Sequence, residues 1–87
     1  MIKFLTFQIG YCVSLDMYDV EVQRDGLAAL LNLAFDANNR MSIAEAGGIA
    51  VVLEALRTHP KDVEVQRKGL GALGNLALDD DNERSIV

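Results

Sequence analysis

The sequence predicts an all-α protein built from a repeated helical unit. The segment 19–24 (Asp-Val-Glu-Val-Gln-Arg) recurs 43 residues later at 62–67. Of the 26 positions from 19 to 44, 17 carry the same residue at that offset. A period of about 40–47 residues is typical of repeats made of two or three helices. Inside one period the apolar residues recur at steps of three to five, which is the spacing of one face of a helix.

Composition and charge restrict the class of function. The chain has 87 residues, of which 51% are hydrophobic and 24% are charged, a balance typical of a folded domain. Its net charge of −5 disfavours nucleic acid as a partner, because binding to phosphates is driven by cationic side chains. Cys12 is the only cysteine, which excludes an internal disulfide and fits a reducing compartment. We therefore expect a cytoplasmic protein, with the nucleus as the alternative.

The first period predicts a long amphipathic helix. We expect it over Val20–Phe35, with Asp19 as its N-cap and Glu21 near its positive end. Turn residues follow at 36–38. The apolar residues of the helix are Val22, Leu27, Leu30, Leu33 and Ala34.

Two shorter helices complete the period. The first is expected over Asn39–Ala46 with Ile43 buried, and the two glycines at 47–48 end it because glycine tolerates the left-handed backbone of a helix stop. The second is expected over Ile49–Thr58. Its apolar face consists of Ile49, Val52, Leu53 and Leu56.

The second period begins after a break at His59–Lys61. Asp62 is the expected N-cap of another long helix, Val63–Leu78. The chain then enters a counterpart of the short helix and stops at Val87.

Four short motifs distinguish the repeated unit. In the first period they are Val22-Gln23, Ala29-Leu30-Leu31-Asn32-Leu33-Ala34, Asn39-Arg40-Met41-Ser42-Ile43 and Ala46-Gly47-Gly48-Ile49. The second period repeats the first three as Val65-Gln66, Ala72-Leu73-Gly74-Asn75-Leu76-Ala77 and Asn82-Glu83-Arg84-Ser85-Ile86. This combination resembles the armadillo repeat family over residues 19–87. The resemblance implies an armadillo-type α-solenoid, a right-handed superhelix of three-helix repeats whose long helices line a concave groove.

The repeat divides the chain into three segments. Residues 1–18 form a divergent segment that we interpret as a degenerate helix of a preceding repeat, centred on Phe4–Leu15. Residues 19–61 are one repeat period, and residues 62–87 are a second, truncated one, about one and a half to two repeats in all. A solenoid buries its apolar faces between neighbouring repeats, so we expect exposed apolar surface at both ends and self-association.

The N-terminal residues also carry a weak likeness to a signal peptide. Lys3 precedes an apolar stretch, but Gln8 interrupts it and no small-residue cleavage site follows before Asp16. The sequence holds no run of eighteen apolar residues, so we expect no membrane-spanning helix.

The resemblance assigns a peptide-binding role to one asparagine of each long helix. In armadillo proteins this asparagine points into the groove and bonds the backbone of an extended segment, which an amide suits because it both donates and accepts. Residues three and four positions apart share that helix face. The candidate groove residues are Glu21, Arg24, Ala28 and Asn32 in the first period and Glu64, Arg67, Gly71 and Asn75 in the second. Alternatively, each asparagine hydrogen-bonds a neighbouring helix and holds the stack together.

One departure from the family narrows the choice of partner. Nuclear-import adaptors of this fold carry a tryptophan one turn before the asparagine, where this chain has Ala28 and Gly71. The sequence contains no tryptophan. Recognition of nuclear localisation signals is therefore not expected.

Other motifs fit a structural interpretation better than a chemical one. The glycines 69, 71 and 74 spell G-x-G-x-x-G, but they fall inside a predicted helix, whereas a dinucleotide site needs a strand-to-helix turn; we expect helix packing there. The acidic run 79–83 lacks the glycine of a calcium loop and is expected to be a solvated turn. His59 stands in a loop without a nearby nucleophile, and Cys12 stands in an apolar segment where a buried, inert thiol is expected.

The sequence therefore predicts a protein-interaction module without catalytic activity, cofactor, metal or small-molecule substrate. Its expected partner is an extended protein segment held in the concave groove. The alternative is a structural spacer in a larger solenoid protein whose binding or catalytic site lies elsewhere.

Overall fold

The protein is all-helical over the residues that its structure, a computed structural model, describes, namely 17–79. Helices make up 76% of this range, which contains no strand. The four helices are α2 (Val20–Leu33), α3 (Ala37–Glu45), α4 (Gly48–Thr58) and α5 (Val63–Leu76). The predicted all-α class is confirmed. The expected helix at Phe4–Leu15 and the acidic run beyond Asp79 lie outside the described residues.

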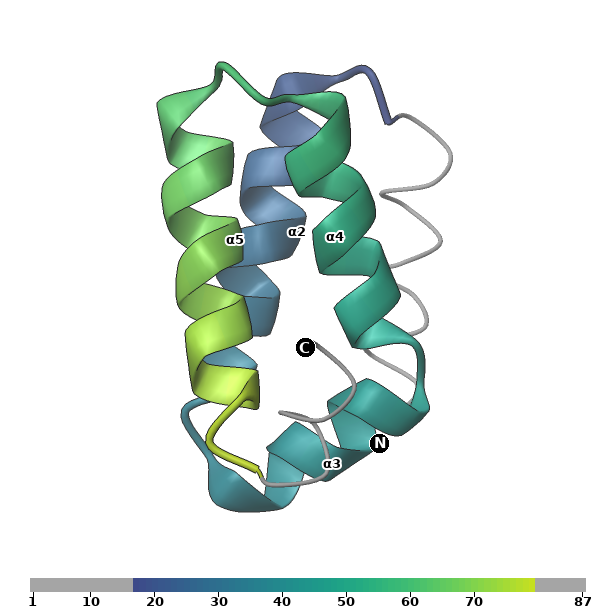
Figure 1. Ribbon diagram of the computed structural model, residues 1–87, viewed down its shortest axis with the longest axis vertical. Helices are drawn as coiled ribbons and strands as arrows, with labels where there is room; N and C mark the ends of the chain where they lie inside the picture. The colour runs from purple at the N-terminus through teal and green to yellow at the C-terminus, as the bar shows by residue number, and fades with distance from the viewer. Residues whose placement is uncertain (1–16, 80–87) are drawn as a thin grey trace.

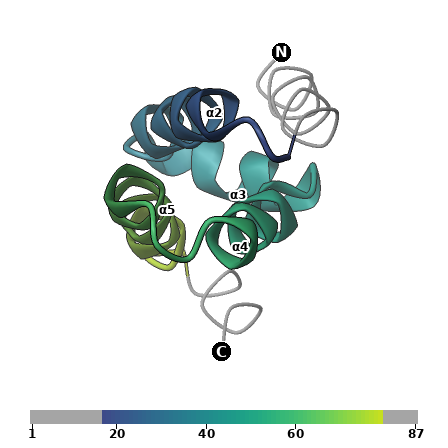
Figure 2. The ribbon, with the colours of Figure 1, turned by 90° about the horizontal axis from the view of Figure 1, so that it is seen from above.

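The two long helices lie side by side and run in the same direction, as Figure 1 shows for α2 and α5. Helix α4 runs the opposite way and packs beside α5. The short helix α3 crosses the end of the molecule where α2 stops. Seen from above in Figure 2, α2, α4 and α5 surround a common centre, and α3 lies beneath it. The 43-residue repeat thus places equivalent helices next to each other.

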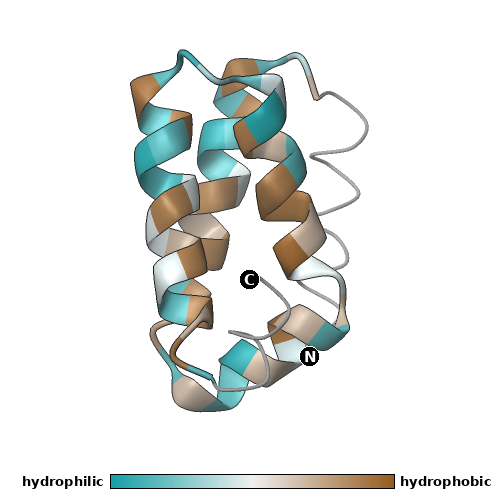
Figure 3. Ribbon diagram, viewed as in Figure 1, coloured by the Kyte–Doolittle hydropathy of each residue, from teal (hydrophilic) through white to brown (hydrophobic). Residues whose placement is uncertain are grey.

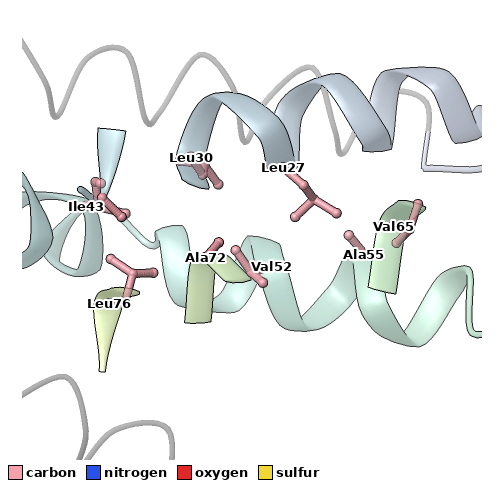
Figure 4. Packing of buried hydrophobic residues seen from close by; sticks show 9 residues of the cluster. Leu27, Leu30, Ile43, Val52, Ala55, Val65, Ala72 and Leu76 are labelled. Atoms are coloured by element: carbon pink, nitrogen blue, oxygen red, sulfur yellow. The ribbon is translucent and has the colours of Figure 1, made fainter. Parts of the chain in front are cut away.

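The core is a small apolar cluster between these helices. In Figure 4, Leu27 and Leu30 of α2 point toward the side chains of α4. Each fully buried Leu or Ile side chain contributes about 1.5–3 kcal/mol to folding, so the core rests on a few large residues. Its members are Leu27, Leu30, Ala34, Ile43, Val52, Ala55, Val65, Ala72 and Leu76.

Side-chain caps determine where the helices begin. Asp19 accepts hydrogen bonds from the backbone N–H groups of Glu21 (3.0 Å) and Val22 (3.3 Å), which confirms it as the N-cap of α2. Asp62 caps α5 in the same way by accepting from Val65 (2.9 Å). These bonds satisfy N–H groups that have no partner within the helix.

The structure corrects four details of the predicted elements. Helix α2 ends at Leu33 rather than Phe35, and α5 ends at Leu76 rather than Leu78. Residues 36–38 are not a free turn, because Asp36 accepts from the N–H of Asn38 at 2.7 Å and so starts α3 directly. Leu53, expected on the buried face of α4, is 37% exposed.

The two glycines at the start of α4, its N-cap Gly47 and its first residue Gly48, serve different purposes. Gly47 has a φ of +88°, in the left-handed region that side chains rarely adopt. Gly48 allows close packing, because a Cβ there would lie 2.3 Å from Ile43 Cγ2 and 2.9 Å from its carbonyl oxygen. The glycine pair therefore reverses the chain and seats α4 directly on the buried Ile43.

The three glycines of α5 differ in their surroundings. The G-x-G-x-x-G motif lies within the helix, as predicted. A Cβ on Gly69 would lie 2.5 Å from Leu56 Cδ2, and one on Gly71 would lie 3.1 Å from Leu31 Cδ1. These two glycines allow close approach of α4 and α2, as predicted, but a Cβ on Gly74 would meet no atom of residues 17–79 within 4 Å. The packing role expected for Gly74 is therefore wrong for the described residues.

No helix within residues 17–79 combines the length and the hydrophobicity that crossing a bilayer requires.

Because Gly69 and Gly74 have different surroundings in the same helix, substituting each by alanine is expected to change the stability of the protein in opposite directions. Gly74→Ala is expected to stabilise the protein by up to about 1 kcal/mol, because alanine favours the helix and the space is open. Gly69→Ala is expected to destabilise it by about 1 kcal/mol, because displacing Leu56 outweighs the same helical gain. Urea denaturation followed by circular dichroism measures both. Equal stabilisation by the two variants would contradict the close packing of α4 on α5.

Candidate peptide-binding surface

The predicted groove residues form two parallel rows on α2 and α5. The rows come together because the two helices lie side by side. Glu21 and Asn32 of α2 and Arg67 of α5 are exposed. The other members, Arg24, Ala28, Glu64, Gly71 and Asn75, are partly buried. The eight residues therefore lie on two adjacent, parallel helices.

An ion pair joins the rows near the start of α5. Arg24 Nε donates to Asp62 Oδ1 at 3.2 Å, and Arg24 Nη2 donates to the other carboxylate oxygen. These bonds, followed by the bond from the Val65 N–H, lower the pKa of Asp62 to about 2. The same bonds raise the pKa of Arg24. Sequence analysis predicted Asp62 as a helix cap but missed its contact with α2, which spans 38 residues.

Farther along the helices, α2 and α5 make close contact. Leu31 of α2 packs where Gly71 of α5 leaves room. One turn farther along α5, the side chain of Asn75 donates to the carbonyl oxygen of Leu31 at 3.4 Å. Asn75 thus makes the bond between neighbouring helices that was considered as the alternative to peptide binding.

The equivalent asparagine of α2 is in a different situation. Asn32 is exposed, and its side chain makes no hydrogen bond with any residue of the described range. Its amide can therefore donate to and accept from an external backbone without breaking an internal bond. Ala28, one turn earlier, has a small side chain that leaves room for an incoming chain.

The charges on this surface nearly balance. Glu64 pairs with Arg67 at 2.8 Å and with Lys68 at 3.7 Å within α5. Arg24 is paired with Asp62, and Glu21 adds one exposed carboxylate. Exposed pairs such as Glu64–Arg67 contribute little to stability, and the paired charges leave no strong electrostatic field for a highly charged ligand.

The remaining motif residues close the ends of helices. The Gln66 side chain donates to the carbonyl oxygens of Leu56 and His59, both at 3.0 Å, and so caps the C-terminal end of α4. At the end of α2, Asn39 donates to Leu33 and Arg40 donates to Ala34. These carbonyls lie at the ends of helices, so Gln66, Asn39 and Arg40 hold the helices in place rather than line a site.

The single histidine makes a long-range contact that sequence analysis missed. His59 Nε2 donates to the carbonyl oxygen of Met17 at 2.6 Å, although 42 residues separate them. This bond ties the loop between α4 and α5 to the residues that precede α2. His59 thus acts here as a structural donor.

The remaining candidates are a metal site, the acidic run 79–83 and Cys12. They either lack support within residues 17–79 or lie outside these residues. Within residues 17–79 no three His, Cys, Asp or Glu side chains gather as a metal site would require. Of the acidic run 79–83 only Asp79 is described, and Cys12 lies outside the described residues.

Comparisons with protein-family models, curated proteins and solved structures gave no match to this chain.

The pKa of Asp62 predicts a specific acid sensitivity. Because this pKa is lower in the folded state than its ordinary value of 3.8, the ion pair stabilises the fold at pH values above that value. The stabilisation is lost as pH falls from about 4 to about 2. At pH 6 the variant Asp62→Asn, which keeps an N-cap residue, should therefore melt at a lower temperature than the wild type. The two melting temperatures should converge as the pH falls to 2.

The exposed pair Glu54–Arg57 provides a control for this titration, because it lies within one helix and is solvated. At every pH between 2 and 6, Glu54→Gln is expected to melt at nearly the same temperature as the wild type. A constant difference between wild type and Asp62→Asn at all pH values would refute the role of the ion pair.

The cap made by Gln66 predicts a loss of stability on removing its donor. Gln66→Glu keeps the shape but replaces the NH2 group with an oxygen that cannot donate when ionised. We expect a loss of about 1–3 kcal/mol, because two carbonyls at the end of α4 are left without a partner. Denaturation at pH 7 measures the loss, and protonating the carboxyl at low pH should recover part of it. Wild-type stability of Gln66→Glu at pH 7 would show that the bonds contribute nothing.

Proposed function

We propose that the chain is part of an armadillo-type solenoid and binds an extended protein segment, without catalysis, across α2 and α5. The observation that carries the proposal is the exposed, unbonded amide of Asn32 beside a second helix of the same repeat type. An extended segment has free N–H and C=O groups on its backbone, and such an amide can satisfy one of each.

The arrangement of the helices supports the solenoid part of the proposal. Helices α3, α4 and α5 follow one another as a short, a medium and a long helix, and α2 is the long helix of the unit before. The two long helices are equivalent by sequence, parallel and adjacent. A stack of such units presents its long helices as a continuous surface, which suits a ligand that is itself extended.

The chemistry of the surface indicates which segments would bind. Its charges are largely paired, so a strongly basic or acidic segment gains little there. Phe35 and Leu78 follow the C-caps of α2 and α5 at equivalent positions, and they are 65% and 64% exposed. We expect a segment of low net charge with apolar side chains that cover this end of the surface.

The spacer interpretation remains the second candidate, because the bond from Asn75 to Leu31 favours it. An asparagine that bonds the neighbouring helix stabilises the stack whether or not a ligand is present. The two functions are compatible within one amide, since the Asn75 NH2 group holds α2 while its oxygen can still accept a bond.

A selection experiment tests the proposal. The 87-residue chain is used to select binders from a phage-displayed library of random twelve-residue peptides, and enriched peptides are titrated against Asn32→Ala, Asn75→Ala and Asn38→Ala. Asn38 is an exposed asparagine on α3 and provides the matched control. Asn32→Ala is expected to weaken binding about fivefold, the equivalent of about 1 kcal/mol for one hydrogen bond. Asn38→Ala should have no effect.

The same variants separate binding from stacking. Asn75→Ala is expected to lower the unfolding free energy by about 0.5–1.5 kcal/mol, because it removes a bond between α2 and α5. Failure to enrich any peptide, or equal affinities of the Asn32→Ala and Asn38→Ala variants, would leave the spacer function as the better account.

A further inference from the structure

One face of α5 is exposed although it is apolar. Val63 and Leu70 are seven residues apart and therefore share a face of the helix, and they are 65% and 60% exposed. Arg67 lies between them on that face and is also exposed. Figure 3 shows that hydrophobic residues recur along α5 from its first turn onward. An apolar helix face of this kind is typical of an interaction surface.

The equivalent face of α2 shows what covers such a surface. Leu27, which corresponds to Leu70, is fully buried. Arg24, which corresponds to Arg67, pairs with Asp62 at the start of α5. The molecule therefore contains this face in its covered form: Leu27 is buried in the core cluster with residues of α4 and α5, and the parallel long helix α5 supplies the N-cap aspartate that pairs with Arg24.

Helix α2 carries the other half of the same interface. Asp19, the counterpart of Asp62, is exposed and has no ion pair within the described residues. Ala28 corresponds to Gly71, the small residue over which Leu31 packs. The exposed Asn32 corresponds to Asn75, which bonds the neighbouring helix. Each copy of the chain thus offers both complementary surfaces.

We propose that α2 of one copy docks on the exposed face of α5 of a second copy, head to tail, with Arg67 of one copy facing Asp19 of the other. The occupant is a second copy because α2 carries Asp19 and Ala28, the counterparts of the Asp62 and Gly71 that meet the equivalent face within the molecule. The two surfaces differ, so the contact is heterologous and leaves a free surface at each end for further copies. The interface repeats the contact between α2 and α5 except that Gly74 stands in place of Leu31, and it uses Ala28 and Asn32, which also belong to the proposed peptide-binding surface.

Sedimentation velocity of the 87-residue chain over a range of concentrations tests the association. The average mass is expected to rise with concentration and to pass beyond that of a dimer. Leu70→Glu should weaken association about tenfold or more, because it places a charge in an apolar contact. Met41→Glu, at a 47% exposed apolar residue on α3, is the matched control and should associate like the wild type. A monomer at all concentrations, or equal effects of the two variants, would overturn the proposal.

A charge-exchange experiment tests the head-to-tail pairing. Arg67→Glu and Asp19→Lys should each weaken self-association, because like charges then meet at every contact. A one-to-one mixture of these two variants restores opposite charges at every contact and should associate again. Asp19→Asn, which keeps an N-cap residue, should weaken association without unfolding the helix. Circular dichroism establishes that each variant is folded before it is compared. A mixture that behaves like the separate variants would refute the pairing of Arg67 with Asp19.

Discussion

The contact between α2 and α5 is the constraint on which the rest of the molecule depends. These helices are far apart in the sequence, and three interactions fix their register: the Arg24–Asp62 ion pair, the packing of Leu31 over Gly71 and the bond from Asn75 to Leu31. Helices α3 and α4 return the chain so that the second long helix lies beside the first. The core closes between them, and the candidate surface exists only because the two rows of residues are held in line.

The ion pair illustrates how one residue can serve two levels of structure. Asp62 caps its own helix through Val65 and binds Arg24 of the preceding repeat. Forming the cap therefore places the carboxylate where the neighbouring helix needs it. This coupling makes the start of α5 and its docking against α2 a single event, which suits a fold whose units gain stability from their neighbours.

Much of the fold could be predicted from the sequence, because helices, caps and turns depend on local patterns. The repeat predicted the helices, and Asp19 and Asp62 predicted where the two long ones start. Ile43 was predicted as a core residue, and Gly47 was predicted as part of a helix stop. The exact helix ends could not be predicted, since Asn39 and Arg40 reach back to close α2 and that choice depends on side-chain geometry. The partner of Asp62 was equally inaccessible, because an ion pair over 38 residues depends on how the helices pack.

The candidate site could be predicted from the sequence less well than the fold, because identical residues have different surroundings. Leu27 is buried and Leu70 is exposed, although both occupy the same position of the repeat. Asn75 bonds the neighbouring helix, whereas the side chain of Asn32 makes no such bond within residues 17–79. A repeated motif identifies the position in the unit, but only the packing shows which copy has a neighbour. The surroundings of each asparagine therefore follow from the packing of its helix rather than from its motif.

The glycine at position 74 has a consequence for the curvature of the proposed solenoid. It occupies the repeat position of Leu31, whose side chain lies between α2 and α5. The distance between packed helices depends on the side chains at their contact, about 8–10 Å between axes. A helix seated on α5 meets no leucine at that point and can approach more closely there. Successive steps of the stack would then bend by unequal angles, so the two repeats differ in shape-determining residues although most of their sequence is the same.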